Sequence, residues 1–108
     1  MASEKIFENK VKKYIEEQGG YWIKHFANRM TKVGIPDLII CINGYFVAAE
    51  IKAQNGHPSE LQIYNCKKIR EAGGFSFILY PSGFDDFKRI IRGLKGDFWN
   101  LNEPLVLK

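Results

Sequence analysis

The chain has 108 residues, which is the size of one folded domain and too short for a two-domain enzyme. Hydrophobic residues make up 45% of it and charged residues 26%, so it has enough apolar material for a packed core and lacks the composition of a disordered chain. Sixteen Lys and Arg against twelve Asp and Glu give a formal net charge of +4, which favours a polyanionic partner.

Composition excludes several classes of protein. Cys41 and Cys66, with only His25 and His57 beside them, are too few for a disulfide scaffold or a tetrahedral zinc site, and we expect both cysteines to be reduced and in or near a core. No apolar run approaches the ~20 residues of a membrane span, and the amino terminus carries no secretory signal. We therefore expect a soluble protein that is not secreted and works in the cytoplasm of a prokaryotic or phage-infected cell.

A helix over residues 3–18 is the first predicted element. Its apolar side chains recur at a spacing of 3.6 residues, Ser3 is a suitable N-cap, and Gly19-Gly20 ends it. One carboxylate, Glu8, falls at the edge of the apolar stripe, where it can reach a neighbouring sheet. It can equally be a solvated flank, and Glu4, one turn earlier on the same side, is its rival.

The next segments predict a strand and a basic loop. Residues 21–27 are rich in aromatic and β-branched residues, which is typical of a strand, and residues 28–34 resemble an exposed loop. If the partner is a nucleic acid, Arg29 and Lys32 in this loop are the first candidates for contacts with phosphate, and Lys24 is a second choice.

A β-hairpin is predicted over residues 38–49. Two apolar runs, 38–42 and 45–49, flank Asn43-Gly44, which is the strongest short hairpin signal because both loop positions of a type I′ turn need a positive φ.

The carboxyl-terminal half predicts a helix, a strand and another helix. Ser59 followed by Gln62 makes a capping-box start for the first of these. The three elements span residues 59–72, 75–80 and 82–94, and residues 96–108 show no clear period and receive no assignment. The order is helix, three strands, helix, strand, helix, which predicts an α/β sandwich whose second helix crosses over to a strand beside the hairpin.

The register of the hairpin brings two carboxylates together. With a two-residue loop, Ile42 pairs with Tyr45, and counting outward along both strands places Asp37 opposite Glu50. This is a non-hydrogen-bonded pair, so the Cα atoms would be ~4.5 Å apart and the side chains would share a face. Like charges in such a pair persist where one is protonated or where a cation lies between them.

A lysine and a carbonyl complete this constellation. Lys52 lies two residues beyond Glu50 and projects from the same face. Asp37 and Glu50, with the backbone carbonyl of Ile51 available as a third ligand, suit Mg²⁺ or Mn²⁺, which take phosphate oxygens as further ligands. Lys52 would orient a metal-bound water or stabilise developing negative charge. The alternative is that these residues are solvated surface charges. We disfavour it, because Asp37 after a proline, the Glu-x-Lys sequence at residues 50–52 and a hairpin register that brings them together all occur in one chain.

The two motifs resemble a nuclease signature. Gly34-Ile35-Pro36-Asp37 followed by Glu50-Ile51-Lys52 resembles the PD-(D/E)XK signature, and the predicted order is similar to the common core of that superfamily. The Gly-x-Pro-Asp form, the short spacing and Ser59-x-x-Gln62 most resemble the stand-alone VRR-NUC branch, over about Glu4 to Tyr80. The resemblance implies that residues 1–108 form one domain with the fold class α/β, a restriction-endonuclease-like three-layer sandwich of order α-β-β-β-α-β-α around a mixed central sheet.

The resemblance also implies roles for single residues. Asp37 and Glu50 would be metal ligands, Lys52 the catalytic lysine and Gln62 an additional active-site glutamine, while Glu8 matches the acidic residue on the first helix of the superfamily. Without the resemblance, capping of the helix at Ser59 accounts for Gln62 completely.

The function implied is that of a Mg²⁺- or Mn²⁺-dependent endonuclease. It would hydrolyse phosphodiester bonds in branched DNA such as Holliday junctions or flaps, and cutting two strands of a junction would need two sites and hence a homodimer. The alternatives are a non-catalytic DNA-binding module that keeps the fold and a protein-interaction domain.

The predicted phosphate contacts can be tested by salt dependence. We expect Arg29→Ala and Lys32→Ala to weaken DNA binding and to flatten its salt dependence, because each phosphate contact contributes about one unit to the slope of log affinity against log salt. Fluorescence anisotropy with labelled DNA over a series of NaCl concentrations measures this slope. An unchanged slope in the double variant would place the DNA path elsewhere.

Overall fold

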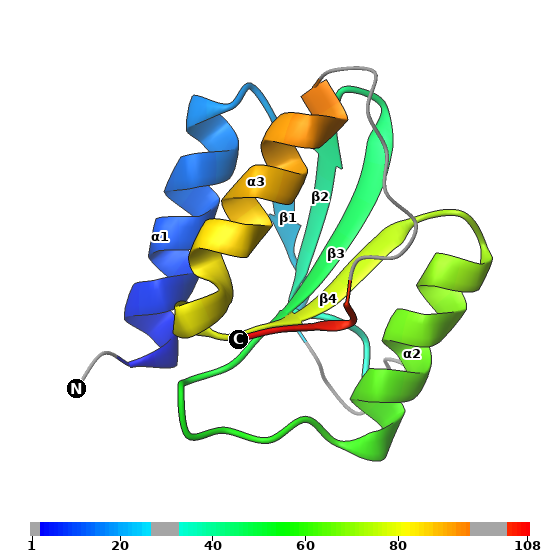
Figure 1. Ribbon diagram of the computed structural model, residues 1–108. Helices are drawn as coiled ribbons and strands as arrows, with labels where there is room; N and C mark the ends of the chain where they lie inside the picture. Colours follow the sequence, from blue (N-terminus) through cyan, green and yellow to red (C-terminus); the bar gives the residue numbers. More distant parts are fainter. Residues whose placement is uncertain (1–2, 27–32, 96–103) are drawn as a thin grey trace.

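The computed structural model describes residues 3–26, 33–95 and 104–108 (Figure 1). The described chain is an α/β structure with three α-helices and a five-stranded mixed sheet in the order β1-β2-β3-β4-β5. Its elements are α1 (Glu4–Glu17), β1 (Tyr21–Lys24), β2 (Leu38–Ile42), β3 (Tyr45–Ile51), α2 (Glu60–Glu71), β4 (Phe75–Leu79), a 3₁₀ turn (Pro81–Gly83), α3 (Phe84–Lys95) and β5 (Val106–Leu107). Among the helices of this described part, none has the length and apolar character that a membrane crossing requires.

Helices cover both faces of the sheet (Figure 1). The larger core lies between the sheet and the pair α1 and α3, and it is closed by edge-to-face ring contacts such as Phe7 with Phe84 and Phe77 with Phe87. On the opposite face α2 packs against β4, where Cys66 and Ile78 form a smaller buried cluster. The predicted α/β class and mixed sheet are therefore confirmed.

The hairpin has the predicted turn and register. Asn43 and Gly44 both have positive φ, 49° and 82°, as a type I′ turn requires. Ile42 pairs with Tyr45 and Leu38 with Ala49, which is the register predicted from the sequence. Continued by one residue, the same register sets Asp37 against Glu50 at the far end of the hairpin.

Capping chemistry fixes two of the helices. The hydroxyl of Ser3 accepts a hydrogen bond from the backbone of Ile6 at the start of α1. At the start of α2, Ser59 and Gln62 exchange both bonds of a capping box. The crossover through α2 makes β4 parallel to β3, so the predicted position of this strand beside the hairpin is confirmed.

Several predicted boundaries and one burial prediction need correction. The last helix begins at Phe84 and not at Ser82, because Pro81 starts a separate 3₁₀ turn before it. The strand predicted to end at Tyr80 ends at Leu79, and the first strand ends at Lys24, while its predicted end, residue 27, lies outside the described residues. Cys41 is exposed and Cys66 is buried, so the prediction that both lie in or near a core is wrong for Cys41.

The carboxyl-terminal segment, left without assignment from the sequence, contributes the edge strand β5. Ile78 and Tyr80 donate backbone hydrogen bonds to Leu105 and Leu107, at 2.9 and 3.0 Å. Gly83 lies directly against this strand, because a Cβ at its position would be 2.1 Å from the backbone of Leu107. The 3₁₀ turn and β5 therefore fit together only with glycine there.

The segment that leads into Asp37 is docked against α2. The side-chain amide of Asn65 donates to the carbonyls of Val33 and Leu61, at 3.1 and 2.9 Å. Gly34 follows with a φ of +83°, and a Cβ there would be 2.8 Å from the backbone carbon of Leu61. This position therefore needs glycine for two separate reasons.

Gly34→Ala is expected to destabilise the fold by more than a positive φ alone explains. Gly19 is the matched control, since its φ is +84° but a Cβ there has no neighbour within 4 Å. We expect Gly19→Ala to cost about 1 kcal/mol through backbone strain and Gly34→Ala to cost at least about 2 kcal/mol, because it adds a clash with α2. Urea unfolding of both variants measures the difference, and equal losses would contradict the docking of this segment.

Candidate active site

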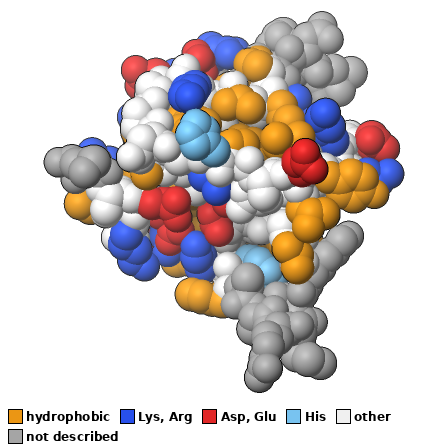
Figure 2. All heavy atoms as spheres, turned by 90° about the horizontal axis from the view of Figure 1, so that it is seen from below, with side chains coloured by type: hydrophobic (Ala, Val, Ile, Leu, Met, Phe, Trp, Pro, Cys, Tyr) orange, Lys and Arg blue, Asp and Glu red, His pale blue; other side chains and the backbone are white. Residues whose placement is uncertain are grey.

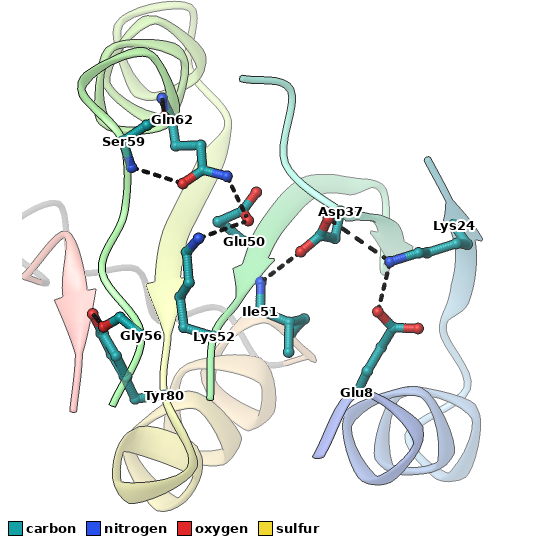
Figure 3. A network of polar contacts seen from close by, with 10 residues as sticks. All are labelled: Glu8, Lys24, Asp37, Glu50, Ile51, Lys52, Gly56, Ser59, Gln62 and Tyr80. Carbon is teal, nitrogen blue, oxygen red and sulfur yellow. Dashed lines mark hydrogen bonds and ion pairs between the residues drawn. The ribbon is translucent and has the colours of Figure 1, made fainter. Parts of the chain in front are cut away.

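The predicted site residues that lie in the described parts of the chain meet at one end of the sheet, where β2 begins and β3 ends (Figure 3). Figure 3 shows side chains from α1, β1, β3, α2 and the segment before β2 converging there. Figure 2 views the molecule from below and shows acidic side chains next to Lys and Arg side chains on that face. The site therefore combines elements from most of the chain.

Asp37 and Glu50 form the centre of the site. Asp37 Oδ2 accepts a hydrogen bond of 3.2 Å from the backbone nitrogen of Ile51, which holds this carboxylate beside β3. Glu50 is only 3% exposed. Burial, followed by the nearby carboxylate of Asp37, raises the pKa of Glu50 to about 8. The two carboxyl groups thus interact as the register predicted, and one of them is hard to ionise.

Gln62 and Lys52 both contact Glu50. Gln62 Nε2 donates to Glu50 Oε2 at 2.9 Å, while its Oε1 accepts from the backbone of Ser59 at 2.8 Å. The capping box therefore fixes the amide of Gln62 so that its donor faces the carboxylate. Lys52 Nζ lies 3.7 Å from the same Glu50 oxygen.

Tyr80 supports the loop that follows Lys52. Its hydroxyl donates a 2.7 Å hydrogen bond to the carbonyl of Gly56 (Figure 3). The backbone nitrogen of Lys52 donates to Leu79 at 3.0 Å, so the lysine is still tied to β4 after β3 has ended. The backbone is therefore held at Lys52 itself by β4 and at Gly56, four residues later, by Tyr80.

Glu8 reaches the site from α1. Its side chain is buried, and Oε1 accepts a 2.6 Å hydrogen bond from Lys24 Nζ, which is also 3.7 Å from Asp37 Oδ1. Glu4 is exposed, so of the two acidic candidates on α1 Glu8 is the one built into the site. Burial opposes ionisation of Glu8, but the hydrogen bond from Lys24 and the nearby ammonium group of Lys12 outweigh it and lower the pKa of Glu8.

Lys24 has a place that the sequence did not indicate. It was predicted as a second choice for binding phosphate, whereas the structure sets its ammonium between Glu8 and Asp37. The pairing of β1 with β2, which sets Lys24 opposite Leu38, is the signal that would have shown its proximity to Asp37. Arg29 and Lys32, the other two candidates for phosphate contacts, lie outside the described residues.

The residues present fit a single divalent cation with oxygen ligands. Glu50 Oε1 is buried and has no hydrogen-bond partner among the residues that the structure describes, so it is available to bind a cation. The carbonyl of Ile51 would face Pro36 if the hairpin register continued, and proline has no N–H to bond it. In the described parts of the chain no three His, Cys, Asp or Glu side chains cluster closely enough to bind a metal. Mg²⁺ and Mn²⁺ suit such a site because waters complete their coordination.

Comparison with known proteins assigns this chain to no family. No protein-family model matches it, and no curated protein matches it either.

The raised pKa of Glu50 predicts a pH-dependent cost of folding. Between the ordinary value of 4.5 and about 8, the unfolded chain loses the Glu50 proton while the folded chain keeps it. The free energy of unfolding therefore falls as the pH rises through this window and levels off above it. Glu50→Gln cannot ionise and avoids this loss.

Melting curves in EDTA test this prediction. We expect Glu50→Gln to melt close to wild type near pH 4.5 and to be more stable at pH 8.5 by roughly 1–3 kcal/mol, which is several degrees for a domain of this size. Glu71→Gln, at an exposed position on α2, is the control and should not change the pH profile. If the difference in stability between Glu50→Gln and wild type is the same at pH 4.5 and at pH 8.5, the raised pKa of Glu50 is wrong.

Proposed function

We propose that this protein is a Mg²⁺- or Mn²⁺-dependent endonuclease that hydrolyses phosphodiester bonds of DNA. The observation that carries the proposal is the pair of facing carboxyl groups, Asp37 and Glu50, with Lys52 3.7 Å from one of them. A protein gains no stability from burying a second carboxyl group beside the first, so the arrangement is better explained by a bound cation.

Each side chain of the site has a role in this reaction. Asp37 and Glu50 would hold the metal, and the amide of Gln62 keeps Glu50 in place. A Mg²⁺ or Mn²⁺ held there would supply the Lewis acidity that polarises a phosphodiester and lowers the pKa of a water molecule. Lys52 orients the water and stabilises the negative charge that develops on the phosphate oxygens as the new P–O bond forms and the ester P–O bond breaks.

The arrangement of the elements supports a restriction-endonuclease-like fold. A helix with a buried acidic residue packs beside a hairpin that carries Asp37 and Glu50, and a crossover helix leads to a parallel strand. This combination resembles the PD-(D/E)XK core, and Gly34 to Asp37 with Ser59 and Gln62 resembles the VRR-NUC branch. In this proposal the strand β5 is an addition at the edge of that core.

Branched DNA is the proposed substrate, with Holliday junctions and flaps as the candidates that the resemblance implies. The net charge of +4 is consistent with a polyanionic partner. A single small site cleaves one strand at a time, so paired cuts across a junction require a symmetric homodimer.

A protein-interaction module is the second candidate, favoured by exposed apolar side chains on one sheet face. Tyr21, Ile23 and Phe46 are 69%, 54% and 48% exposed. Tyr21 pairs with Cys41, which pairs with Phe46, so Tyr21 and Phe46 lie in one row on the face that α2 only partly covers. Such a surface suits a protein partner, and a chain with this function alone would not cleave DNA.

Cleavage assays on labelled four-way junction, flap, splayed and linear duplexes test the proposal. We expect cleavage with Mg²⁺ or Mn²⁺ and none in excess EDTA. Asp37→Ala, Glu50→Ala and Lys52→Ala should each lower the rate by about 100-fold or more, because these groups act on charge in the transition state.

The exposed residue Glu71 provides the control, and Glu71→Ala should cleave at the wild-type rate. Circular dichroism confirms that each variant is folded. Undiminished cleavage in EDTA, or near wild-type rates in two of the three site variants, would overturn the proposed mechanism.

A further inference from the structure

Lys24 places a fixed positive charge beside the proposed metal site. Its ammonium is 2.6 Å from Glu8 Oε1 and 3.7 Å from Asp37 Oδ1, and it thus bridges α1 and the hairpin (Figure 3). The side chain is 19% exposed and that of Glu8 is 4% exposed, so water screens this pair weakly. The ion pair is therefore a built part of the site and not a mobile surface contact.

The other oxygen of Glu8 is also compensated. Glu8 Oε2 has no hydrogen-bond partner in the described part of the chain but forms an ion pair with Lys12 Nζ at 3.0 Å. Lys12 in turn sits 4.4 Å above the ring of Trp22, whose indole nitrogen donates to Glu16 at 2.7 Å. The buried carboxylate of Glu8 thus faces two ammonium groups that the surrounding side chains hold in place.

This environment disfavours a metal ion at Glu8. A divalent cation bound there would lie within a few ångströms of two like charges, which repel it strongly at a weakly screened position. Glu50 differs, because among the described residues its Oε1 has no hydrogen-bond partner, and the ammonium of Lys52, at 3.7 Å, approaches the other oxygen. The two carboxylates therefore differ in their capacity to bind a cation.

We propose that the chain binds one divalent cation, at Asp37 and Glu50, and that Lys24 supplies the second positive charge of the site with Glu8 as its counterion. This inference rests on the proposed function. It gives Glu8, which the resemblance matches to the acidic residue on the first helix of the superfamily, the role of a counterion and not of a metal ligand. Lys24 is a positioning residue, because it acts on the reaction by holding Asp37.

Calorimetric titration of the full chain with Mn²⁺ tests the inference with a readout independent of cleavage. Glu8→Gln alone should weaken binding about tenfold whether Glu8 is a ligand or a counterion, because it removes a negative charge near the metal. The double variant Glu8→Gln/Lys24→Met separates the two roles, because it removes the ion pair and leaves the net charge unchanged.

A counterion role predicts that the double variant binds one Mn²⁺ per chain with an affinity within about threefold of wild type. If the double variant binds as weakly as Glu8→Gln, Glu8 is a ligand and the inference is wrong. Binding of two Mn²⁺ ions per wild-type chain, and of only one per Glu8→Gln chain, would overturn the inference as well.

Melting curves check that each variant is folded. If Glu8→Gln/Lys24→Met does not fold, Glu8→Gln/Lys24→Gln replaces it in the titration, because its two amides can hydrogen-bond to each other.

Two controls distinguish failure of this inference from failure of the proposed function. Asp37→Asn and Glu50→Gln should abolish Mn²⁺ binding, and wild-type binding in both would overturn the metal site itself. The exposed pair Lys68 and Glu71, 3.3 Å apart, provides a matched double variant, Lys68→Met/Glu71→Gln, that removes an ion pair far from the site. Its Mn²⁺ affinity should equal that of wild type, and a change would show that loss of any ion pair perturbs binding.

Discussion

Repulsion between two carboxyl groups held together by a hairpin is the constraint on which this site depends. The turn at Asn43-Gly44 fixes the register, and the register continued by one residue places the backbone of Asp37 opposite that of Glu50. Burial of Glu50 makes the repulsion costly, because little water is present to screen it. The neighbouring polar groups can be understood as different ways of reducing that cost.

Each neighbour acts on one part of the carboxyl pair. The backbone nitrogen of Ile51 and the ammonium of Lys24 approach Asp37, whereas the amide of Gln62 and the ammonium of Lys52 approach Glu50. These donors come from different elements, so the site exists only when the helices and the sheet are assembled. Within the described parts of the chain, Glu50 Oε1 is the oxygen of this carboxyl pair that is buried without a hydrogen-bond partner.

Local chemistry made much of this arrangement predictable from the sequence. The hairpin follows from two residues that accept positive φ, and the convergence of Asp37 and Glu50 follows from counting along it. The place of Lys24 was not predictable in the same way, because it depends on the pairing of β1 with β2, which no short motif encodes. The exposure of Cys41 was missed for a similar reason: alternation along β2 defines two faces but does not say which of them a helix covers.

The strand β5 also bears on how molecules of this protein meet one another. Without it, β4 would be the last strand of the sheet, and its free N–H and C=O groups would lie beside fully buried apolar residues, Phe77, Ile78 and Leu79. Exposed edges of this kind pair with strands of other molecules and seed aggregates. By accepting hydrogen bonds from Ile78 and Tyr80, Leu105 and Leu107 cover that edge. Val106 pairs with Ile78, which in turn pairs with Glu50, so the strand that blocks this route to association lies in the same row of the sheet as the buried carboxyl group.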